Sequence, residues 1–348
     1  MGRCNNVVAT ESLAPNARLL LIQVARIGDT LLITPALRAL KEALPAGRLG
    51  CLLHPARREL LEGLSFIDEL GAITPRTALW RGRFGERHWD IALVYGNDAP
   101  LIHFAARVAE RVVAFEQHDE ALNAILWKAV PASPTSVHAV AERLRLPAAL
   151  GIETRDHRLA YAPSAGELAT ARDWLTRHAI SRHMLVGFQV ASFTTKSYRD
   201  WPLGHFAELG RRLLARHPEA RVLVFGDKNS RQAATALVRE LGARVIPAAG
   251  ALRIRETAAL MARLSLYVGV DTGPTHLAGA LGVPMVALYH CYHPGRYLAP
   301  LQHDQLRVLE HPATGANCSR TEPMSDISVD QVWNAVESLL GAPHLSPR

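Results

Sequence analysis

The chain has 348 residues, of which 49% are hydrophobic and 20% are charged, a composition that excludes a disordered or fibrous protein. This length exceeds one ordinary core and indicates two domains. The formal net charge of +7 comes without a dense block of Lys and Arg. It therefore favours a small anionic ligand or an anionic membrane surface over nucleic acid, with a solvated basic surface as the alternative.

The first half of the chain shows repeated strand–turn–helix units. An apolar run at residues 18–25 predicts a buried strand, and a Gly-containing turn at 26–30 precedes apolar residues at helical spacing up to Leu44. Further strands are predicted at 48–54 and 90–95. This order predicts a doubly wound parallel sheet.

The second half repeats the pattern after a Pro-, Gly- and Ala-rich connection at residues 146–164. A helix is predicted at 167–178 and a last helix at 328–340. The strands between them are predicted at 184–190, 221–225, 244–246, 266–270 and 284–289. Two doubly wound α/β domains follow from this alternation, although that outline is shared by several enzyme classes.

The segment from Val268 to Ala287 carries the most chemistry. A buried strand ends at Val270, the turn Asp271, Thr272 and Gly273 follows, and Pro274 stands where a helix begins. The amides and dipole of a helix start can hold a phosphate. Thr272, Thr275 and His276 add side-chain donors there, while the alternative is that Asp271 and Thr272 only cap the helix and His276 is a buried helix residue.

Two segments resemble a known family. Asp-Thr-Gly-Pro-Thr-His-Leu-Ala, beginning at Asp271 and followed by Ala-Leu-Gly-Val-Pro, resembles the donor-binding signature of glycosyltransferase family 9, the heptosyltransferases. Residues 20–41 are similar to the N-terminal signature of that family. The resemblance implies a GT-B fold, an α/β architecture in which two Rossmann-like doubly wound parallel-sheet domains face a central cleft.

The resemblance also implies that the two domains bind different substrates. Residues 1–160 would bind the acceptor and carry the catalytic base, and residues 161–327 would bind the nucleotide-sugar donor. Residues 328–348 would form a helix and tail that pack back near the interdomain junction. The donor would contact the segment Asp271, Thr272, Gly273, Pro274, Thr275 and His276.

Asp29 is the catalytic base that the resemblance implies. A carboxylate at a turn after a parallel strand lies at the carboxyl edge of the sheet, where α/β sites form, and can take a proton from an acceptor hydroxyl. Gly28 would let the backbone turn beside it. The alternative for Asp29 is the N-cap of the helix that begins near Thr30, and one residue can fill both roles.

A basic loop follows the first strand of the second half. In the family a basic residue just before Trp-Pro neutralises the leaving diphosphate; Arg199 is nearest to that position, and Lys196 is the competitor. Thr194 and Thr195 are further candidates for phosphate contact. Cations are needed here in a metal-independent transferase, because charge builds up on the departing nucleotide. The alternative is a surface loop with Trp201 buried.

Other segments are less informative. The stretch 225–229 follows a strand and would border the nucleotide or form a plain turn, and His290, Cys291 and His293 depart from the family pattern. The four cysteines, Cys4, Cys51, Cys291 and Cys318, offer neither a disulfide framework nor a zinc signature. We expect no metal and no cofactor. No apolar run reaches the roughly 18 residues of a membrane span, and no signal peptide is evident.

The expected activity is inverting transfer of heptose from ADP-heptose to a lipopolysaccharide core or lipid A-type acceptor. It would take place in a reducing cytoplasm, with peripheral contact at the inner face of the inner membrane and without nucleic acid. One alternative keeps the fold with a different donor such as a UDP-hexose, and another is a non-catalytic nucleotide-sugar or carbohydrate-binding relative. A nicotinamide-dependent oxidoreductase is disfavoured because no GxGxxG follows a strand.

Overall fold

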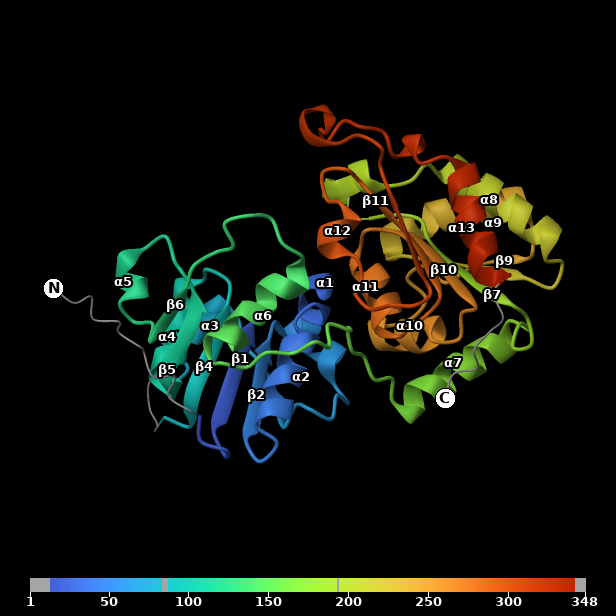
Figure 1. Cartoon of the computed structure of the whole chain (residues 1–348). Helices are drawn as coiled ribbons and strands as arrows, with labels where there is room; N and C mark the ends of the chain where they lie inside the picture. The colour runs from blue at the N-terminus through green and yellow to red at the C-terminus, as the bar shows by residue number, and fades with distance from the viewer. Residues whose placement is uncertain (1–12, 83–86, 193, 342–348) are drawn as a thin grey trace. The chain divides into compact units, whose positions relative to one another are not determined.

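The computed structural model describes residues 13–82, 87–192 and 194–341 (Figure 1). The described chain divides into two compact units. The first contains the residues up to Ala25 together with Ile33–Arg58 and Leu64–His157, and the second contains Arg26–Leu32, Glu59–Gly63 and the residues from Arg158 onward. The turn that follows the first strand thus belongs to the second unit.

The first unit is built on a parallel sheet with the strand order β3-β2-β1-β4-β5-β6. Its strands are β1 (Arg18–Gln23), β2 (Arg48–Leu53), β3 (Glu69–Ala72), β4 (Trp89–Tyr95), β5 (Ala109–Phe115) and β6 (Lys128–Val130). The central strand β1 is buried along almost its whole length, as its Leu-rich sequence predicts for a parallel strand covered on both faces.

Helices cover both faces of the first sheet. They are η1 (Pro55–Leu61), α2 (Thr34–Ala43), α3 (Pro75–Ala78), α4 (Ala99–Val108), α5 (Glu120–Asn123) and α6 (Ala139–Ala149). Helices α3 and α4 pack on one another and on the cluster that contains Leu20, Ile22 and Val94. Helices α2 and α6 contact each other and the strands β2 and β5.

The second unit repeats this topology, with the strand order β12-β11-β10-β7-β8-β9. Its strands are β7 (Leu185–Gln189), β8 (Arg221–Phe225), β9 (Val245–Pro247), β10 (Leu266–Val270), β11 (Met285–Tyr289) and β12 (Leu306–Glu310). All pairings are parallel. The chain reverses its winding between β7 and β10, which is where doubly wound sheets bind ligands.

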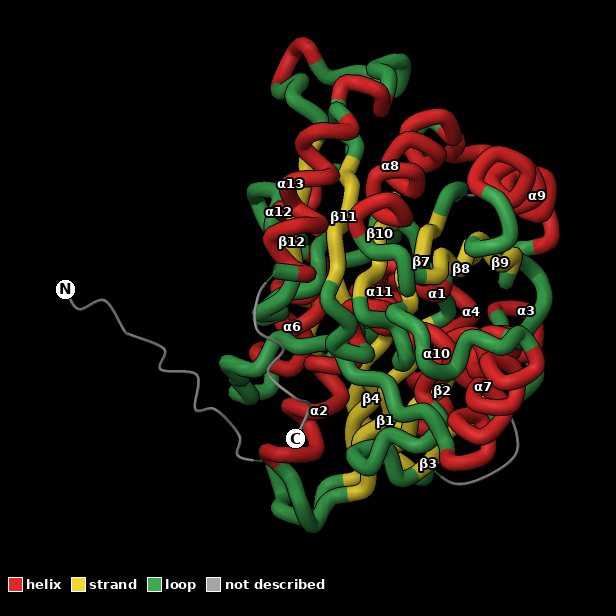
Figure 2. Tube along the Cα trace, turned by 90° about the vertical axis from the view of Figure 1, so that its right-hand side faces the viewer, coloured by secondary structure: helices red, strands yellow, loops and turns green. Residues whose placement is uncertain are grey.

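Helices surround the second sheet as well. They are α1 (Ile27–Leu31), α7 (Ala165–Arg177), η2 (Thr194–Arg199), α8 (Leu203–Arg216), η3 (Lys228–Ser230), α9 (Arg231–Leu241), α10 (Ile254–Met261), α11 (Gly273–Ala280), α12 (Gly295–Leu298), η4 (Gly315–Asn317), η5 (Met324–Asp326) and α13 (Val329–Leu340). Helix α8 contacts both α9 and α13, and Figure 2 shows α8 and α9 beside the strands β7, β8 and β9.

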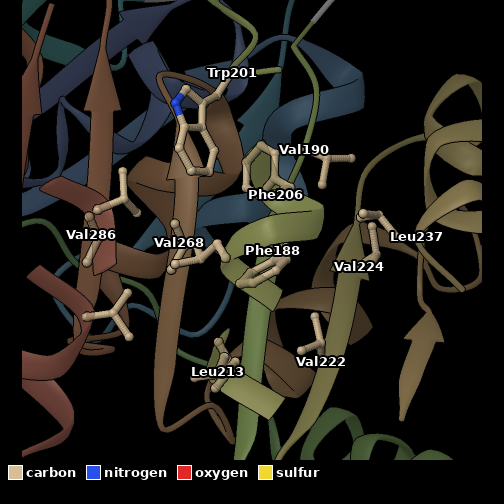
Figure 3. Close-up of a cluster of buried hydrophobic side chains, with 14 of the residues drawn as sticks. Phe188, Val190, Trp201, Phe206, Leu213, Val222, Val224, Leu237, Val268 and Val286 are labelled. Atoms are coloured by element: carbon tan, nitrogen blue, oxygen red, sulfur yellow. The ribbon is translucent and has the colours of Figure 1, made fainter. Parts of the chain in front are cut away.

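The main core of this unit lies between α8, α9, α13 and one face of the sheet (Figure 3). Phe188 and Phe206 are fully buried with ring centroids 5.4 Å apart, and each such side chain contributes about 1.5–3 kcal/mol relative to exposure. Trp201 lies over Phe206, and its Nε1 donates to the Ile327 carbonyl at 2.8 Å. Because Trp201 follows Arg199 by two positions, this core anchors the loop that carries Arg199.

Arg255 fixes helix α10 in place. Its guanidinium is only 7% exposed and donates to the Glu167 carboxylate and to the Ala162 carbonyl, each at 2.9 Å, and to the Glu62 carbonyl at 3.2 Å. Glu167 also accepts from the Ser164 amide in the capping box of α7. Helix α10, which borders the site described below, is therefore tied to α7 and to the segment Glu59–Gly63.

The expected doubly wound sheets are confirmed, although four strands were not predicted. The edge strands β3 and β12 lack a buried apolar run, and the edge strand β6 has only three residues. The inner strand β5 carries the charged residues Glu110 and Arg111 near its start, so its apolar run is short. Helix α6 runs to Ala149, so the first part of the connection expected at 146–164 is helical. The last helix is observed close to its predicted bounds, in contact with α8 and the strands β10 to β12.

Candidate active site

The site lies in the second unit, at the carboxyl ends of β7 and β10 where the sheet reverses its winding. A cavity of about 530 Å³ opens there. Residues from α1, from the loops after β7, β8, β10 and β11, and from α10 and α11 line it. Its size fits a small molecule such as a nucleotide.

Arg199 and Asp271 form a buried ion pair at the wall of this cavity. Asp271 follows β10 directly, and Arg199 ends the short helix η2 after β7. Arg199 Nη1 lies 2.5 Å from Asp271 Oδ2, with the residues 7% and 4% exposed. Arg199 Nε also donates to the Tyr198 hydroxyl at 3.3 Å. The guanidinium is therefore held in one orientation, and much of its charge is offset by the carboxylate.

Lys196 lines the same cavity on a loop that is closed by its own hydrogen bonds. The Ser192 amide donates to Asp200 Oδ1 at 2.7 Å, and Ser192 Oγ donates to the Lys196 carbonyl at 2.8 Å. Burial, with the nearby charges of Arg199 and Arg26, lowers the pKa of Lys196. Burial also raises the pKa of Asp200. The loop brings both candidate cations to one wall.

The start of helix α11, which follows Asp271, also lines the cavity. Thr272 is its N-cap residue, Gly273 and Pro274 open it, and all three line the cavity together with His276. His276 Nε2 lies 3.9 Å from Asp271 Oδ1. Thr272 makes no side-chain cap hydrogen bond, so neither it nor Asp271 acts as the side-chain cap considered above.

Thr275 is the member of this segment that does not line the cavity. Its hydroxyl donates to the Val270 carbonyl at 2.5 Å and lies 3.0 Å from the Tyr267 hydroxyl in a fully buried position. The donor contact expected for Thr275 is therefore replaced by a supporting one, because a buried hydroxyl takes the nearest backbone acceptor.

Asp29 and Gly28 reach the cavity from α1. The helix begins earlier than expected, with Arg26 at its N-cap, so Asp29 lies in the first turn and is not the cap. A Cβ on Gly28 would lie 2.7 Å from His276 Cδ2, and one on Gly273 would lie 2.7 Å from Ile27 Cβ. Gly28 is thus required for close packing of α1 on α11, and not for the turn that we expected.

Two threonines of the basic loop, Thr194 and Thr195, were the further candidates for phosphate contact. Thr195 is exposed and is not a lining residue. Thr194 opens η2, but its side chain lies outside the described part of the structure. Among the predicted residues, the structure therefore brings together Asp29, Lys196, Arg199, Asp271, Thr272, Gly273, Pro274 and His276, with Gly28 beneath them.

Part of the cavity lining is apolar and was largely missed from the sequence. Phe225, Leu252, Ile254 and Met261 line it. Asp227, in the stretch considered above, lies at the rim and accepts from the amides of Asn229 and Ser230. In the sequence, Asp227 could be recognised as a candidate only because it follows a strand. The residues of α10 show an amphipathic pattern, which does not identify them as lining residues.

The loop after β11 corrects the expectation for the cysteines. Cys291 and Cys318 form a disulfide, with their Cα atoms 5.8 Å apart, although 27 positions separate them. The parallel pairing of β11 and β12 brings together the segments that follow the two strands, and no sequence spacing reveals it. The loop also places His293 in the lining of the cavity.

No group of three or more His, Cys, Asp and Glu residues in the described ranges is arranged to hold a metal ion. Within those same ranges, no helix has the length and apolar character needed to cross a membrane. The ionisable side chains that line the cavity are those of four Lys or Arg residues, three Asp residues and two His residues.

A comparison with models of protein families shows to which family this chain belongs. The model of glycosyltransferase family 9 (heptosyltransferase) matches residues 115–327, which is more than half of the chain. The chain belongs to glycosyltransferase family 9. The resemblance seen in the two sequence motifs is therefore confirmed, and the family supports a transferase.

Three relatives of this family 9 chain illustrate the similarity. Lipopolysaccharide heptosyltransferase 3 of Escherichia coli is 22% identical over 283 residues, which cover 75% of this chain and 80% of that protein. The family 9 glycosyl transferase of Veillonella parvula DSM 2008 has a TM-score of 0.82 at 21% identity, covering 94% of this chain and 99% of that one. For E. coli ADP-heptose lps heptosyltransferase II the TM-score is 0.75 at 20% identity, with 93% and 98% covered.

These structural matches show that the two doubly wound units are those of the GT-B fold. The expected fold class is therefore confirmed for this family 9 protein. The fold accounts for the position of the cavity at the switch point of the second sheet, because open α/β sheets bind ligands outside the carboxyl ends of their strands.

Proposed function

We propose that this protein is an inverting, metal-independent glycosyltransferase that moves heptose from ADP-heptose to a lipopolysaccharide core acceptor. The observation that carries the proposal is that Asp29 and the segment beginning at Asp271 line one cavity. These residues come from the two separate sequence motifs. The names of the E. coli relatives, which include ADP-heptose and lipopolysaccharide, support this choice of donor and acceptor.

The charges around the cavity suit a diphosphate. The lining cations Arg26, Lys196, Arg199 and Lys228 outnumber by one the lining carboxylates Asp29, Asp227 and Asp271. Arg199 is preorganised by Asp271, and Lys196 lines the same cavity with a second positive charge. We propose that both cations stabilise the negative charge that forms on the leaving diphosphate, because fixed charges in a partly dry site do so efficiently.

The apolar part of the cavity lining is the proposed position of the nucleoside base. Phe225, Leu252, Ile254 and Met261 offer apolar surface for a flat aromatic ring, and the diphosphate is then proposed to contact the charged lining residues. We infer that residues 161–327 hold the donor in this way. Residues 1–160 are proposed to bind the acceptor.

In the proposed reaction Asp29 removes the proton from an acceptor hydroxyl. The oxygen attacks the anomeric carbon of the donor as the bond from that carbon to the diphosphate oxygen breaks. The electron pair leaves with the diphosphate, beside Lys196 and Arg199, and the configuration at the anomeric carbon inverts. A positioned base of this kind contributes roughly 10²–10⁴-fold to the rate.

Calorimetric titration of the purified protein with ADP, ADP-heptose, UDP and UDP-glucose in EDTA tests the donor assignment. Selective binding of the two adenine nucleotides is expected. A preference for the uridine nucleotides would replace the donor by a UDP-sugar and keep the reaction class. Absence of binding by all four compounds would refute the donor site.

A further inference from the structure

His293 lines the cavity and has no role in the proposed reaction. It lies on the loop between β11 and α12. Its amide donates to the His290 carbonyl at 2.9 Å, and Pro294 after it begins helix α12. His290 is fully buried; its Nδ1 accepts from the Tyr292 amide and its Nε2 contacts the Glu322 carbonyl, both at 3.0 Å. The disulfide closes the same loop. His293 is therefore held at a fixed place on the cavity.

The His293 ring contacts two aromatic rings. It stacks on the Tyr198 ring, with centroids 6.2 Å apart and planes at 29°, and meets the Tyr292 ring edge-on at 5.2 Å. In the described part of the chain no hydrogen bond to either nitrogen of this ring is found, and the residue is half-buried. Its polar edge is thus available to a molecule in the cavity.

The electrostatic surroundings of His293 are positive. Burial has the largest effect and, with the charges of Arg199, Lys196, His290 and Arg320, lowers the pKa of His293 to about 4. The imidazole is therefore neutral at neutral pH. The titratable and charged groups on the surrounding elements are Arg26, Asp29, Lys196, Tyr198, Arg199, Asp271, His276, His290, Tyr292 and Arg320.

A bound diphosphate would raise the pKa of His293, because it brings negative charge to these positive surroundings. Its two negative charges would lie beside Lys196 and Arg199 in the proposed complex, where they would offset the cations that lower the pKa of His293 in addition to burial. Proton uptake by His293 then adds a charged donor to the phosphate, and charge-assisted hydrogen bonds are about twice as strong as neutral ones.

We propose that His293 is a phosphate ligand of the donor site and takes up a proton when a nucleotide diphosphate enters the cavity, so that donor binding and proton uptake are coupled. This inference rests on the proposed function, because it needs a diphosphate in the cavity. It adds a third cation to the leaving-group site only while the donor is bound.

Calorimetry with ADP-heptose and UDP-glucose tests the coupling, because their esterified diphosphates do not titrate between pH 6 and 8. Heats measured at pH 6 in two buffers of different ionisation enthalpy, cacodylate and bis-Tris, give the number of protons taken up. Wild-type protein should take up about half a proton or more per sugar nucleotide bound. Its affinity should rise by about 2- to 10-fold from pH 8 to pH 6.

Variants assign the proton to its site. His293→Asn should bind with almost no proton uptake and with an affinity that no longer depends on pH. His293→Arg carries a fixed charge and should regain affinity without uptake, which a purely structural role would not allow. His217→Asn removes a histidine at the end of α8, outside the cavity lining, and should keep the wild-type coupling.

The outcomes separate this inference from the donor assignment. Binding by the wild type with undiminished proton uptake in His293→Asn would overturn the role of His293 and leave the donor site standing. Binding without any uptake by the wild type would do the same. If the wild type bound neither sugar nucleotide, the donor site would be refuted and the inference with it. Thermal unfolding of each variant checks that it is folded.

Discussion

Replacing Arg199 by methionine tests the buried ion pair beneath the cavity. The substitution keeps a long apolar side chain but leaves the Asp271 carboxylate, 4% exposed, without the guanidinium 2.5 Å away. Removing one partner of such a pair costs about 3–5 kcal/mol of unfolding free energy, because a charge stays buried and uncompensated. For a unit of roughly 200 residues this corresponds to a fall in melting temperature on the order of 10 °C.

Urea unfolding followed by tryptophan fluorescence measures this loss. Trp201 lies two positions from Arg199 in the core of the same unit and reports its unfolding. The double variant Arg199→Met with Asp271→Asn removes both charges, so it should recover most of the lost stability. Arg212→Met is the matched control: its partners Glu208 and Asp330 are exposed, and it should cost less than about 1 kcal/mol.

Two results would refute the reasoning. A loss of less than about 1 kcal/mol in Arg199→Met would mean that the pair is not desolvated as the structure describes. A double variant as unstable as the single one would mean that the lost packing of Arg199, and not the unpaired Asp271 carboxylate, determines stability.

Three further predictions concern turnover, packing and the disulfide. Lys196→Met should lower turnover by roughly 10²–10³-fold with little change in melting temperature, since it removes a leaving-group charge; unchanged turnover in an ADP-release assay would exclude Lys196 from that role. Gly28→Ala places a methyl group 2.7 Å from His276 Cδ2 and should cost about 1–3 kcal/mol in urea unfolding, with reduced turnover; wild-type stability and rate would contradict the close packing of α1. Reduction of the Cys291–Cys318 disulfide, whose cysteines are 27 positions apart, should lower the wild-type melting temperature through a loss of roughly 3.5 kcal/mol. The variant with serine at both positions should not respond to reductant, and a wild type that is equally insensitive would argue against the pairing.

The sequence predicts most of the fold because buried parallel strands are continuous apolar runs. Strands β1, β8, β10 and β11 were found in this way. Three of the four edge strands, β3, β6 and β12, were missed, since β3 and β12 are only partly buried and their sequences need not be apolar, and β6 is short. Edge strands owe their place to pairing with a neighbour, which is a long-range effect.

The site likewise contains residues that the sequence predicts and residues that it does not. The segment from Asp271 to His276 could be predicted because its residues are contiguous and follow a strand end. Thr275 shows the limit of that reasoning, since the turn of the helix directs its hydroxyl inward to Val270. The apolar wall from α10 and the place of His293 arise from segments far apart in the chain, so no local pattern reveals them.

The central claim is that Asp29 acts as the base of a sugar transfer from ADP-heptose. The most direct test measures ADP release from ADP-heptose in EDTA, in the presence of a lipopolysaccharide core acceptor, by the wild type and by Asp29→Asn. The account predicts turnover by the wild type, a loss of about 10²–10⁴-fold in the variant and an ADP affinity that stays within about twofold. Wild-type turnover in Asp29→Asn, or no transfer by the wild type with any sugar nucleotide that it binds, would contradict it.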